Sequence, residues 1–329
     1  MLVVIIIVLY SNCKTPKEAA LKKNKVLSAA ANAAVLMPCW EWWAWPLAKN
    51  FIGGRNLEEA KKNAIRFSQK GYPIIFNYAS EHVKSFWQAS ETRIAYVELL
   101  DWLKDRKISA SLSLKFSQFG LTPKDILRGL KPAETELLLD VLSRARDTNI
   151  RVWIDAEHLS DRLHYSYVLP RLWRMGFENL GRAIQANARD EKWENFVKNC
   201  ALVPMPVRIC KGAYRNGAES LSFATEYPRI LLQYNYALNY FLNLGIETEI
   251  ATHDPEIIGS GYALYCSHFA MLMGVNVQKA RALKNIGEAP HLYFIFGPNW
   301  SGYLKRRILE NPGYLLLPLK EGPSGPEAY

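Results

Sequence analysis

The segment Pro73-Ile-Ile-Phe-Asn-Tyr-Ala-Ser80 begins a regular alternation of short apolar segments and longer helical patterns. Its apolar and aromatic residues predict a β-strand. Seven similar segments follow, and a helical pattern separates each from the next. The predicted strands cover residues 73–80, 108–115, 150–155, 180–186, 206–212, 246–252, 269–273 and 291–296.

Strands that alternate with helices pair in parallel through right-handed crossovers. Eight such units between Pro73 and Asn311 come close to the roughly 250 residues typical of a (β/α)8 barrel. We therefore predict an α/β fold of the TIM-barrel type. The expected domains are an apolar and helical N-terminal extension at 1–70, a catalytic barrel at 71–313 and a C-terminal tail at 314–329. Helices are expected at 57–70, before 105, at 132–147, before 176, and at 193–198, 228–244, 256–266, 277–285 and 303–311.

The composition of the 329 residues is that of an ordinary globular protein, with 49% hydrophobic and 22% charged residues. A net charge of +10 favours anionic partners such as an acidic ligand, a nucleotide or a membrane surface. The sequence has no zinc-finger spacing, RRM signature or basic arm, so nucleic acid is not an expected partner. It also has no GxGxxG or P-loop motif. Five scattered cysteines without a CxxC pair fit a reduced, intracellular setting.

The N-terminal region carries two unusual features. Residues 2–10 form a run of nine apolar residues, which is too short to span a bilayer and lacks the positive flank of a signal peptide. We expect a buried strand or a membrane-dipping segment there. Trp40, Trp42, Trp43 and Trp45 then crowd together. They would either pack on the main domain or lie at a membrane interface, and the sequence leaves both alternatives open.

The carboxyl ends of the predicted strands are where a barrel of this type places its active site. Any one polar residue there is more often structural than catalytic, but a set drawn from most strands would converge on one mouth. The carboxylates and histidines lack the spacing of metal ligands, so we expect no metal. The polar residues at these ends are Asn77, Glu81, Lys115, Gln118, Asp155, Glu157, Gln185, Arg208, Lys211, Thr252, His253 and Tyr293.

The predicted last helix, Tyr303-Leu-Lys-Arg-Arg-Ile-Leu-Glu-Asn311, contains two adjacent arginines. Tyr303 lies three residues before Arg306, and Glu310 lies three after Arg307, so each pair shares a helix face. Taken alone, such a helix is more often a solvated basic surface. Together with Arg208 and Lys211, the two arginines suggest an anionic ligand with at least two charged parts. We expect Ile308 and Leu309 to pack the helix onto the barrel.

At these residues the sequence resembles the proline dehydrogenase family, in its short, single-function bacterial form. The resemblance extends from about Phe51 to Asn311, with the motifs in the family's order. They are Ser113-Leu-Lys-Phe-Ser-Gln-Phe-Gly120, Ile154-Asp-Ala-Glu157, Ile184-Gln-Ala186, Val207-Arg-Ile-Cys-Lys-Gly-Ala-Tyr214, Ala251-Thr-His-Asp254, and Tyr293-Phe-Ile-Phe-Gly-Pro-Asn-Trp300 followed by the 303–311 helix.

The resemblance implies a substrate site for L-proline. Arg306 and Arg307 would clamp its carboxylate, and Glu81 would pair with this clamp when a lid is closed. Tyr293 and Tyr303 would wall the ring, and Leu272 would add an apolar contact. Lys115 would lie near substrate and flavin with Asp155 as its ion-pair partner. Lys115, Asp155 and Tyr293 are thus the implied catalytic residues.

The resemblance also implies FAD as cofactor. A hydride would leave the ring carbon next to nitrogen for flavin N5, giving Δ1-pyrroline-5-carboxylate, the first step of proline catabolism. Electrons would then pass to a membrane quinone, which places the protein in the cytoplasm or at the cytoplasmic face of the inner membrane, with a peripheral membrane contact. The implied cofactor-binding residues are Gln185, Arg208, Lys211, Ala213, Thr252, His253 and Glu310.

Several positions depart from the family pattern, and two alternatives stay open. Asn77 replaces an aspartate, Ser80 a glycine and Asn187 an aromatic residue, and residues 267–270 lack an expected Glu and Gln. One alternative is therefore a catalytically weakened barrel that serves as a membrane-bound scaffold. The other is a Schiff-base aldolase that uses Lys115 or Lys211 as nucleophile.

Overall fold

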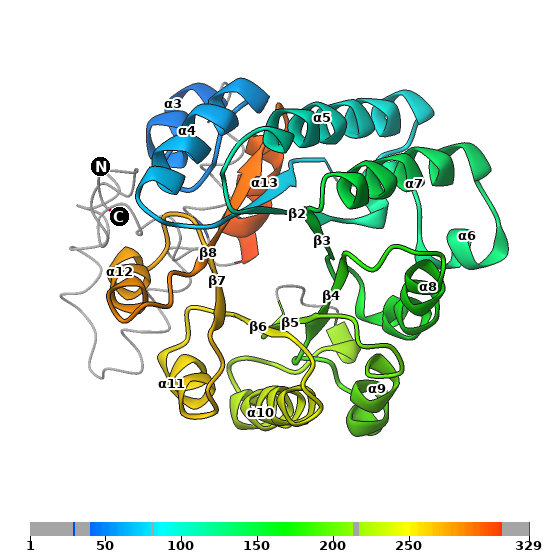
Figure 1. Cartoon of the computed structure of the whole chain (residues 1–329). Helices are drawn as coiled ribbons and strands as arrows, with labels where there is room; N and C mark the ends of the chain where they lie inside the picture. The colour runs from blue at the N-terminus through cyan, green and yellow to red at the C-terminus, as the bar shows by residue number, and fades with distance from the viewer. Residues whose placement is uncertain (1–28, 30–39, 81, 213–216, 311–328) are drawn as a thin grey trace.

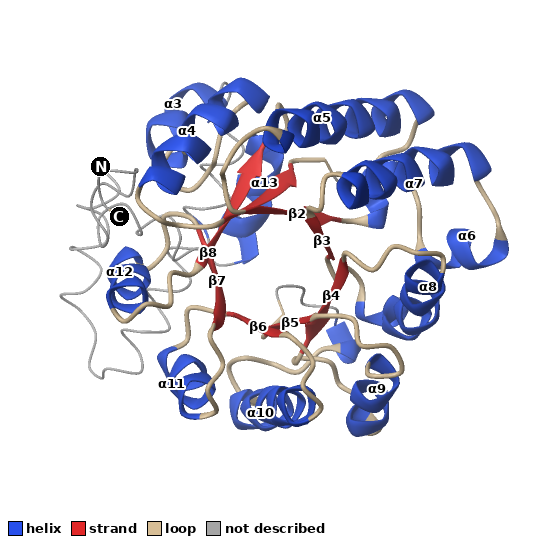
Figure 2. Ribbon diagram, in the orientation of Figure 1, coloured by secondary structure: helices blue, strands red, loops and turns tan. Residues whose placement is uncertain are grey.

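The computed structural model describes residues 29, 40–80, 82–212, 217–310 and 329. Its strands close into a parallel barrel in the order β1 to β8, with helices around the outside (Figures 1 and 2). The predicted (β/α)8 fold is confirmed. The strands are β1 Ile74–Tyr78, β2 Ala110–Leu114, β3 Arg151–Ile154, β4 Leu180–Gln185, β5 Val207–Cys210, β6 Thr248–Ala251, β7 His268–Leu272 and β8 His291–Phe296.

The helices follow the predicted order, and most ends agree within a few residues. Helices α3 and α6 and three 3-10 turns were not predicted. The helices are α3 Trp40–Ala48, α4 Leu57–Gln69, α5 Phe86–Lys104, α6 Pro123–Arg128, α7 Pro132–Asp147, α8 Arg162–Arg174, α9 Trp193–Cys200, α10 Tyr227–Asn243, α11 Pro255–Ala263, α12 Val277–Asn285 and α13 Trp300–Glu310. The 3-10 turns are η1 Phe116–Phe119, η2 Leu159–Asp161 and η3 Gly217–Glu219.

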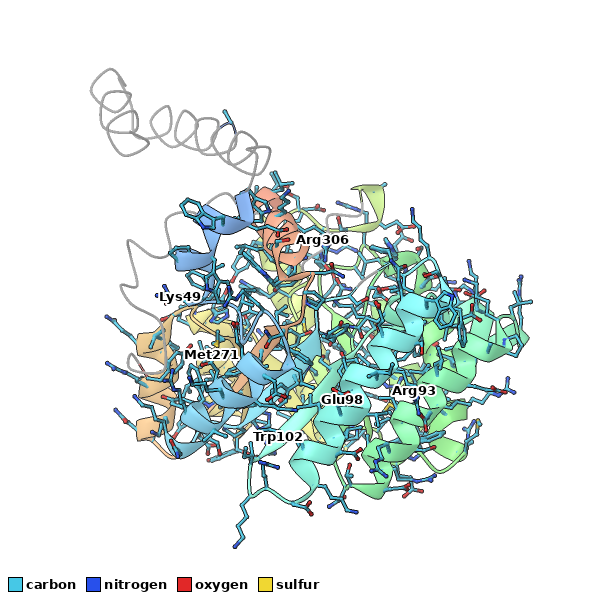
Figure 3. The ribbon with its side chains drawn as sticks, turned by 90° about the horizontal axis from the view of Figure 1, so that it is seen from above. Lys49, Arg93, Glu98, Trp102, Met271 and Arg306 are labelled. Carbon is cyan, nitrogen blue, oxygen red and sulfur yellow. The ribbon has the colours of Figure 1, made fainter. Side chains whose placement is uncertain are left out.

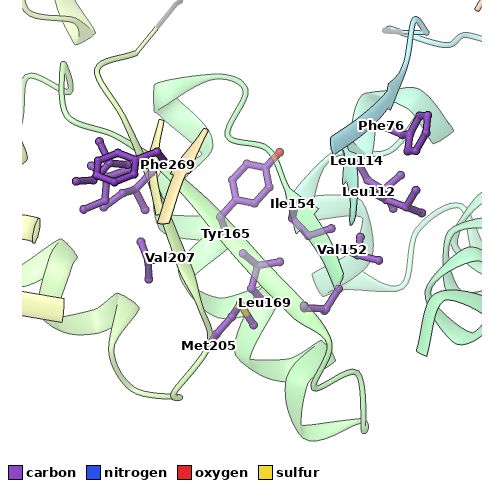
Figure 4. Close-up of a cluster of buried hydrophobic side chains, with 14 of the residues drawn as sticks. Phe76, Leu112, Leu114, Val152, Ile154, Tyr165, Leu169, Met205, Val207 and Phe269 are labelled. Carbon is purple, nitrogen blue, oxygen red and sulfur yellow. The ribbon is translucent and has the colours of Figure 1, made fainter. Parts of the chain in front are cut away.

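Successive side chains along each strand point alternately into the barrel and outward toward the helices. Most outward side chains are apolar, and Figure 4 shows Val152 and Ile154 of β3 together with Tyr165 and Leu169 of α8 in this outer core. The inward residue Trp153 is almost fully buried. Its ring lies so close to β4 that a Cβ on Gly181 would meet it at 2.5 Å, which explains the glycine there.

Helix α13 rests on α3 at the end of the barrel where the strands finish (Figure 3). Trp300 contacts the rings of Trp40 and Trp45, with centroids 6.3 and 5.2 Å away. Trp42, by contrast, is 84% exposed. Two of the described tryptophans thus pack on the main domain, as one alternative predicts, and Trp42 faces solvent. The membrane-interface alternative remains a prediction.

The packing of α13 differs in one respect from the prediction. Ile308 is buried as expected, but Leu309 is 46% exposed, so its expected packing role is wrong. Trp300, at the start of the helix, supplies the missing apolar contact through the cluster with Ala48 and Ile295. The helix is longer than predicted at its N-terminal end, and these added residues hold it in place.

Several predictions concern segments outside the described residues. These are the apolar run at 2–10 and most of the 314–329 tail, of which only Tyr329 is described. The ring of Tyr329 packs against Phe67 and Tyr72 at 5.0 and 5.2 Å. Within the described part of the chain, no helix has the length and apolar character needed to cross a membrane. The domain boundaries at 70 and 313 remain a prediction.

Candidate active site

A cavity of about 740 Å³ opens at the carboxyl ends of the barrel strands. Strand residues, the loops after them and α13 all contribute to its wall. The lining is largely apolar with charged and aromatic side chains set into it, which is typical of a site for a small organic ligand. Predicted site residues in the lining are Lys115, Asp155, Gln185, Arg208, Lys211, Thr252, His253, Leu272, Tyr293, Tyr303 and Arg307.

Arg208 lies at the centre of a buried charge network inside the barrel. Its Nε donates to Glu249 Oε2 at 2.5 Å, and Glu249 Oε1 lies 2.7 Å from His291 Nδ1. Its Nη1 is 3.7 Å from Asp155 Oδ1, and its guanidinium lies 4.3 Å from the Trp153 ring centre. Burial alone would raise the pKa of Glu249, but Arg208 and His291 outweigh it and lower this pKa to about 2. Glu249 therefore stays ionised and holds Arg208 in place.

Asp155 is fixed by two hydroxyl groups at the bottom of the cavity. Tyr293 OH donates to Asp155 Oδ2 at 2.6 Å, and Ser113 Oγ donates to Asp155 Oδ1 at the same distance. Burial and the Asp155 charge raise the pKa of Tyr293 well above its usual value. The phenol thus remains a donor, and Asp155 is an oriented acceptor that faces the cavity.

His253 enters the wall as a neutral imidazole. The backbone N–H of Leu272 donates to His253 Nε2 at 3.1 Å, which leaves the proton on Nδ1. Burial, with a smaller contribution from Lys211, lowers the His253 pKa to about 4. The residue therefore offers an N–H donor to the cavity at neutral pH.

Lys211 follows β5 and is held by the next strand's loop. Its Nζ donates to Asp254 Oδ2 at 2.9 Å, and Tyr227 OH also donates to this oxygen. Asp254 accepts from the backbone of Glu256 as well, so it is also the cap of α11. This ion pair fixes the lysine at the edge of the cavity, whereas a Schiff-base nucleophile must be free to attack a carbonyl.

The two arginines of α13 have different positions. Arg307 lines the cavity, with its guanidinium 5.5 Å from the centre of the Tyr303 ring. Arg306 is half-buried on the same helix but is not part of the lining (Figure 3). The predicted two-arginine clamp is therefore represented in this cavity by Arg307 alone.

The sequence matches the family described as Proline dehydrogenase over residues 60–314. The chain belongs to the proline dehydrogenase family. It is 29% identical to proline dehydrogenase 1 of Bacillus subtilis (strain 168), over 83% of this chain and 89% of that one. Proline dehydrogenase 2 of the same strain is 25% identical over 85% and 91% of the two chains.

Two solved structures share the fold of this proline dehydrogenase family member. Proline utilization A from Bdellovibrio bacteriovorus, inactivated by N-propargylglycine, matches with a TM-score of 0.71 and 20% identity over 96% of this chain. Proline utilization A from Bradyrhizobium japonicum matches with a TM-score of 0.64 and 20% identity over 87% of it. This chain covers only 37% and 33% of those longer proteins, so the likeness concerns the barrel. The family membership makes the chain an oxidoreductase and replaces the aldolase alternative.

Three of the polar residues that were predicted to converge on the mouth of the barrel do not line the cavity, so this prediction is wrong for them. Asn77 Nδ2 donates to the carbonyl of Ser113 at 2.8 Å. Gln118 accepts from the Lys115 backbone at 2.9 Å and donates to the Tyr78 carbonyl at 2.6 Å. Glu157 accepts from the N–H and the hydroxyl of Ser117. Hydrogen bonds to backbone groups near the ends of the strands hold these side chains away from the mouth of the cavity.

Three further predicted residues fall where the structure gives no side-chain description. Glu81 and Ala213 lie outside the described residues, and the backbone of Glu310 is described as the last residue of α13 but its side chain is not. Their expected roles remain predictions.

Sequence reasoning missed several residues that position the site, above all Ser113, Glu249 and Asp254. A signal for Glu249 was present, because a charged residue in the middle of a short buried strand requires a partner. Ser113 lies two residues before Lys115 and so shares its side of β2. Nothing in the sequence identified His291 as the second partner of Glu249.

Proposed function

We propose that the protein oxidises L-proline to Δ1-pyrroline-5-carboxylate with FAD as cofactor. The observation that carries the proposal is the cavity in which Asp155, held by Tyr293, faces cationic residues from β2, β5 and α13. Arginine forks suit a carboxylate, and cations at strand ends suit a diphosphate. The family membership supplies the reaction class.

Three buried polar atoms fit a flavin ring system, which carries both donors and acceptors. Gln185 Oε1, Arg208 Nη2 and His253 Nδ1 have no hydrogen-bond partner within the described structure. All three side chains line the cavity. Because buried polar groups are nearly always paired, these atoms indicate a ligand that meets an acceptor on Gln185 and donors on Arg208 and His253. Lys211 would hold the pyrophosphate, and Thr252 would complete the wall.

The side chains would act mainly by positioning. Arg307, assisted by Arg306, would bind the carboxylate of proline, and Tyr303 would cover its ring. Asp155 and Lys115 would orient the neutral amine that the reaction requires. When bound, FAD supplies the two-electron acceptor for the hydride of the ring carbon next to nitrogen. Arg208 would keep its orientation through Glu249, so the charge near the cofactor stays fixed.

The direct test is to purify the protein, record its absorbance near 450 nm, and add L-proline without oxygen. We expect a yellow protein that bleaches on addition of L-proline. Arg307→Lys is a matched control that keeps the charge but loses the planar fork, and it should bind flavin normally while bleaching slowly. A yellow wild-type protein that proline does not bleach would refute the proposed substrate, and a colourless one would refute the cofactor.

We further propose that the electrons pass to a membrane quinone at the cytoplasmic face of the inner membrane. The net charge of +10 and the exposed Trp42 ring support a peripheral contact with an anionic lipid surface. Sedimentation with vesicles that contain anionic lipid tests the contact, and Trp42→Ala should reduce the bound fraction. Equal binding of the variant would exclude Trp42 from it.

A further inference from the structure

Arg182 is a buried arginine on the outer face of the barrel. It lies in β4 between Gly181 and Ala183, and only 2% of it is exposed. Ala183 lines the active-site cavity, so Arg182 points the other way, toward α8 and α9. Its Nε, Nη1 and Nη2 atoms are all buried and have no hydrogen-bond partner of ordinary geometry among the residues that the structure describes.

The guanidinium borders a second, much smaller cavity behind β4. Residues of β4, of α8 and of α9 line it, and Figure 4 shows Tyr165 and Leu169 of α8 in this part of the core. No carboxylate is among the described lining residues. Arg162, which also lines this cavity, illustrates the usual solution, because its Nη2 and Nε donate to Asp190 at 2.8 and 3.1 Å.

The protein groups around Arg182 do not neutralise it. Cys200 lies close enough to interact with Arg182, but burial raises the pKa of the Cys200 thiol despite the opposing effect of Arg182. The thiol is therefore uncharged at neutral pH. An arginine cannot shed its proton in a protein, and a buried charge without a partner is costly. Arg182 thus requires a negative charge that the described chain does not supply.

We propose that this cavity binds a small monovalent inorganic anion of about the size of chloride. The cavity has a volume of about 20 Å³, which is room for one or two water-sized particles and too little for a phosphate or an organic acid. Arg182 supplies three N–H-bearing nitrogens, and Leu169 of α8 and Phe196 of α9 add apolar surface to the wall. The site stands independently of the redox reaction.

The test compares thermal unfolding of the purified protein in sodium chloride and in sodium gluconate of equal ionic strength. Gluconate is too large for the cavity. At ten times its Kd, chloride should raise the Tm of the wild type by about 2–5 °C, because it binds only the folded state. Arg182→Met should abolish this difference and should be at least as stable as wild type in gluconate.

Arg151→Met is the matched control. Arg151 lies on the neighbouring strand and has its own carboxylate, with Nη2 at 3.0 Å from Glu247. This variant should keep the chloride effect of the wild type. A chloride effect that survives in Arg182→Met would overturn the proposal. Should that variant not fold, crystals of the wild type soaked in bromide decide the matter: an anomalous peak within about 4 Å of the guanidinium supports the site, and its absence rejects it.

Discussion

Arg182 and Arg208 lie on neighbouring strands, are both 2% exposed, and differ in the face of the barrel that they occupy. In the register of β4 and β5, Arg182 is paired with Val207 and Ala183 with Arg208, which places the two guanidinium groups on opposite sides of one sheet. The inner arginine has two carboxylates and an aromatic ring around it. The outer one has a thiol, a small cavity and apolar walls.

The difference shows two ways in which a barrel accommodates a buried cation. Inside, the charge is balanced by the protein itself, so it can serve as a fixed element of the electrostatic field around a ligand. Outside, the charge contributes nothing to the mouth and depends on a counter-ion from solution. Burial alone therefore does not identify a functional arginine, whereas its partners and the face on which it lies do.

The largest effect is expected from breaking the inner network with Arg208→Met. This change leaves Glu249 buried with only His291 as partner, so unfolding free energy should fall by about 3–5 kcal/mol. Flavin binding should also be lost. Urea denaturation and absorbance near 450 nm measure the two effects.

A double variant separates the effect of leaving Glu249 without its partner from the effect of losing the Arg208 side chain. Arg208→Met combined with Glu249→Gln removes both charges, and we expect it to recover a large part of the stability but not the flavin. If the single variant were as stable as wild type, the described network would not contribute to folding.

A third arginine extends the comparison, because the proposed partner of Arg307 is the substrate. Arg307→Met should lower kcat/KM for proline at least about 100-fold, or roughly 3 kcal/mol, and leave flavin bound. The two-arginine clamp predicted from the sequence implies an equal loss of kcat/KM for Arg306→Met. Since only Arg307 lines the cavity, the structure now favours a larger effect at Arg307. Steady-state kinetics of both variants tests this order, and equal losses would favour the two-arginine clamp.

Much of the fold was predictable because strand and helix patterns alternate without interruption. The boundaries of α7, α12 and β8 agree with the predicted 132–147, 277–285 and 291–296. The missed helix α6 carried a local signal, since Thr122 and Asp125 form a capping box around its first turn. The helix is only six residues long, and such a short segment leaves little periodicity to detect.

The site was predictable in its charged residues but not in their partners. Lys115, Arg208 and Lys211 line the cavity, as expected from their position after or near strand ends. The failures at Asn77, Gln118 and Glu157 have a common cause: a sequence gives the position of a polar group but not the backbone donor or acceptor that binds it. The outer arginine was not predicted because Arg182 lies inside β4, whereas the predicted site residues lie near strand ends.

Acid should destabilise the fold through two titratable groups, His253 and Glu249. The pKa of His253 is lowered to about 4 in the folded state, so the unfolded chain takes up this proton first as pH falls, and stability declines between pH 6.5 and about 4. The pKa of Glu249 is lowered to about 2, so its contribution is lost between about pH 4.5 and 2. Urea midpoints against pH measure both. His253→Asn should flatten the upper range and Glu249→Gln the lower, and unchanged profiles would contradict these assignments.

The smallest effect is expected where the inner network has redundancy. Tyr293→Phe removes one of the two hydroxyl donors to Asp155, but the Ser113 donor remains at 2.6 Å. Asp155 also keeps Arg208 within 3.7 Å. Turnover of proline should therefore fall only about tenfold, near 1.4 kcal/mol, with little change in stability. Tyr293→Phe combined with Ser113→Ala should lose more than the product of the single losses, because Asp155 would then have no hydroxyl to orient it. A strictly multiplicative double variant would show that the two hydroxyls act on separate groups.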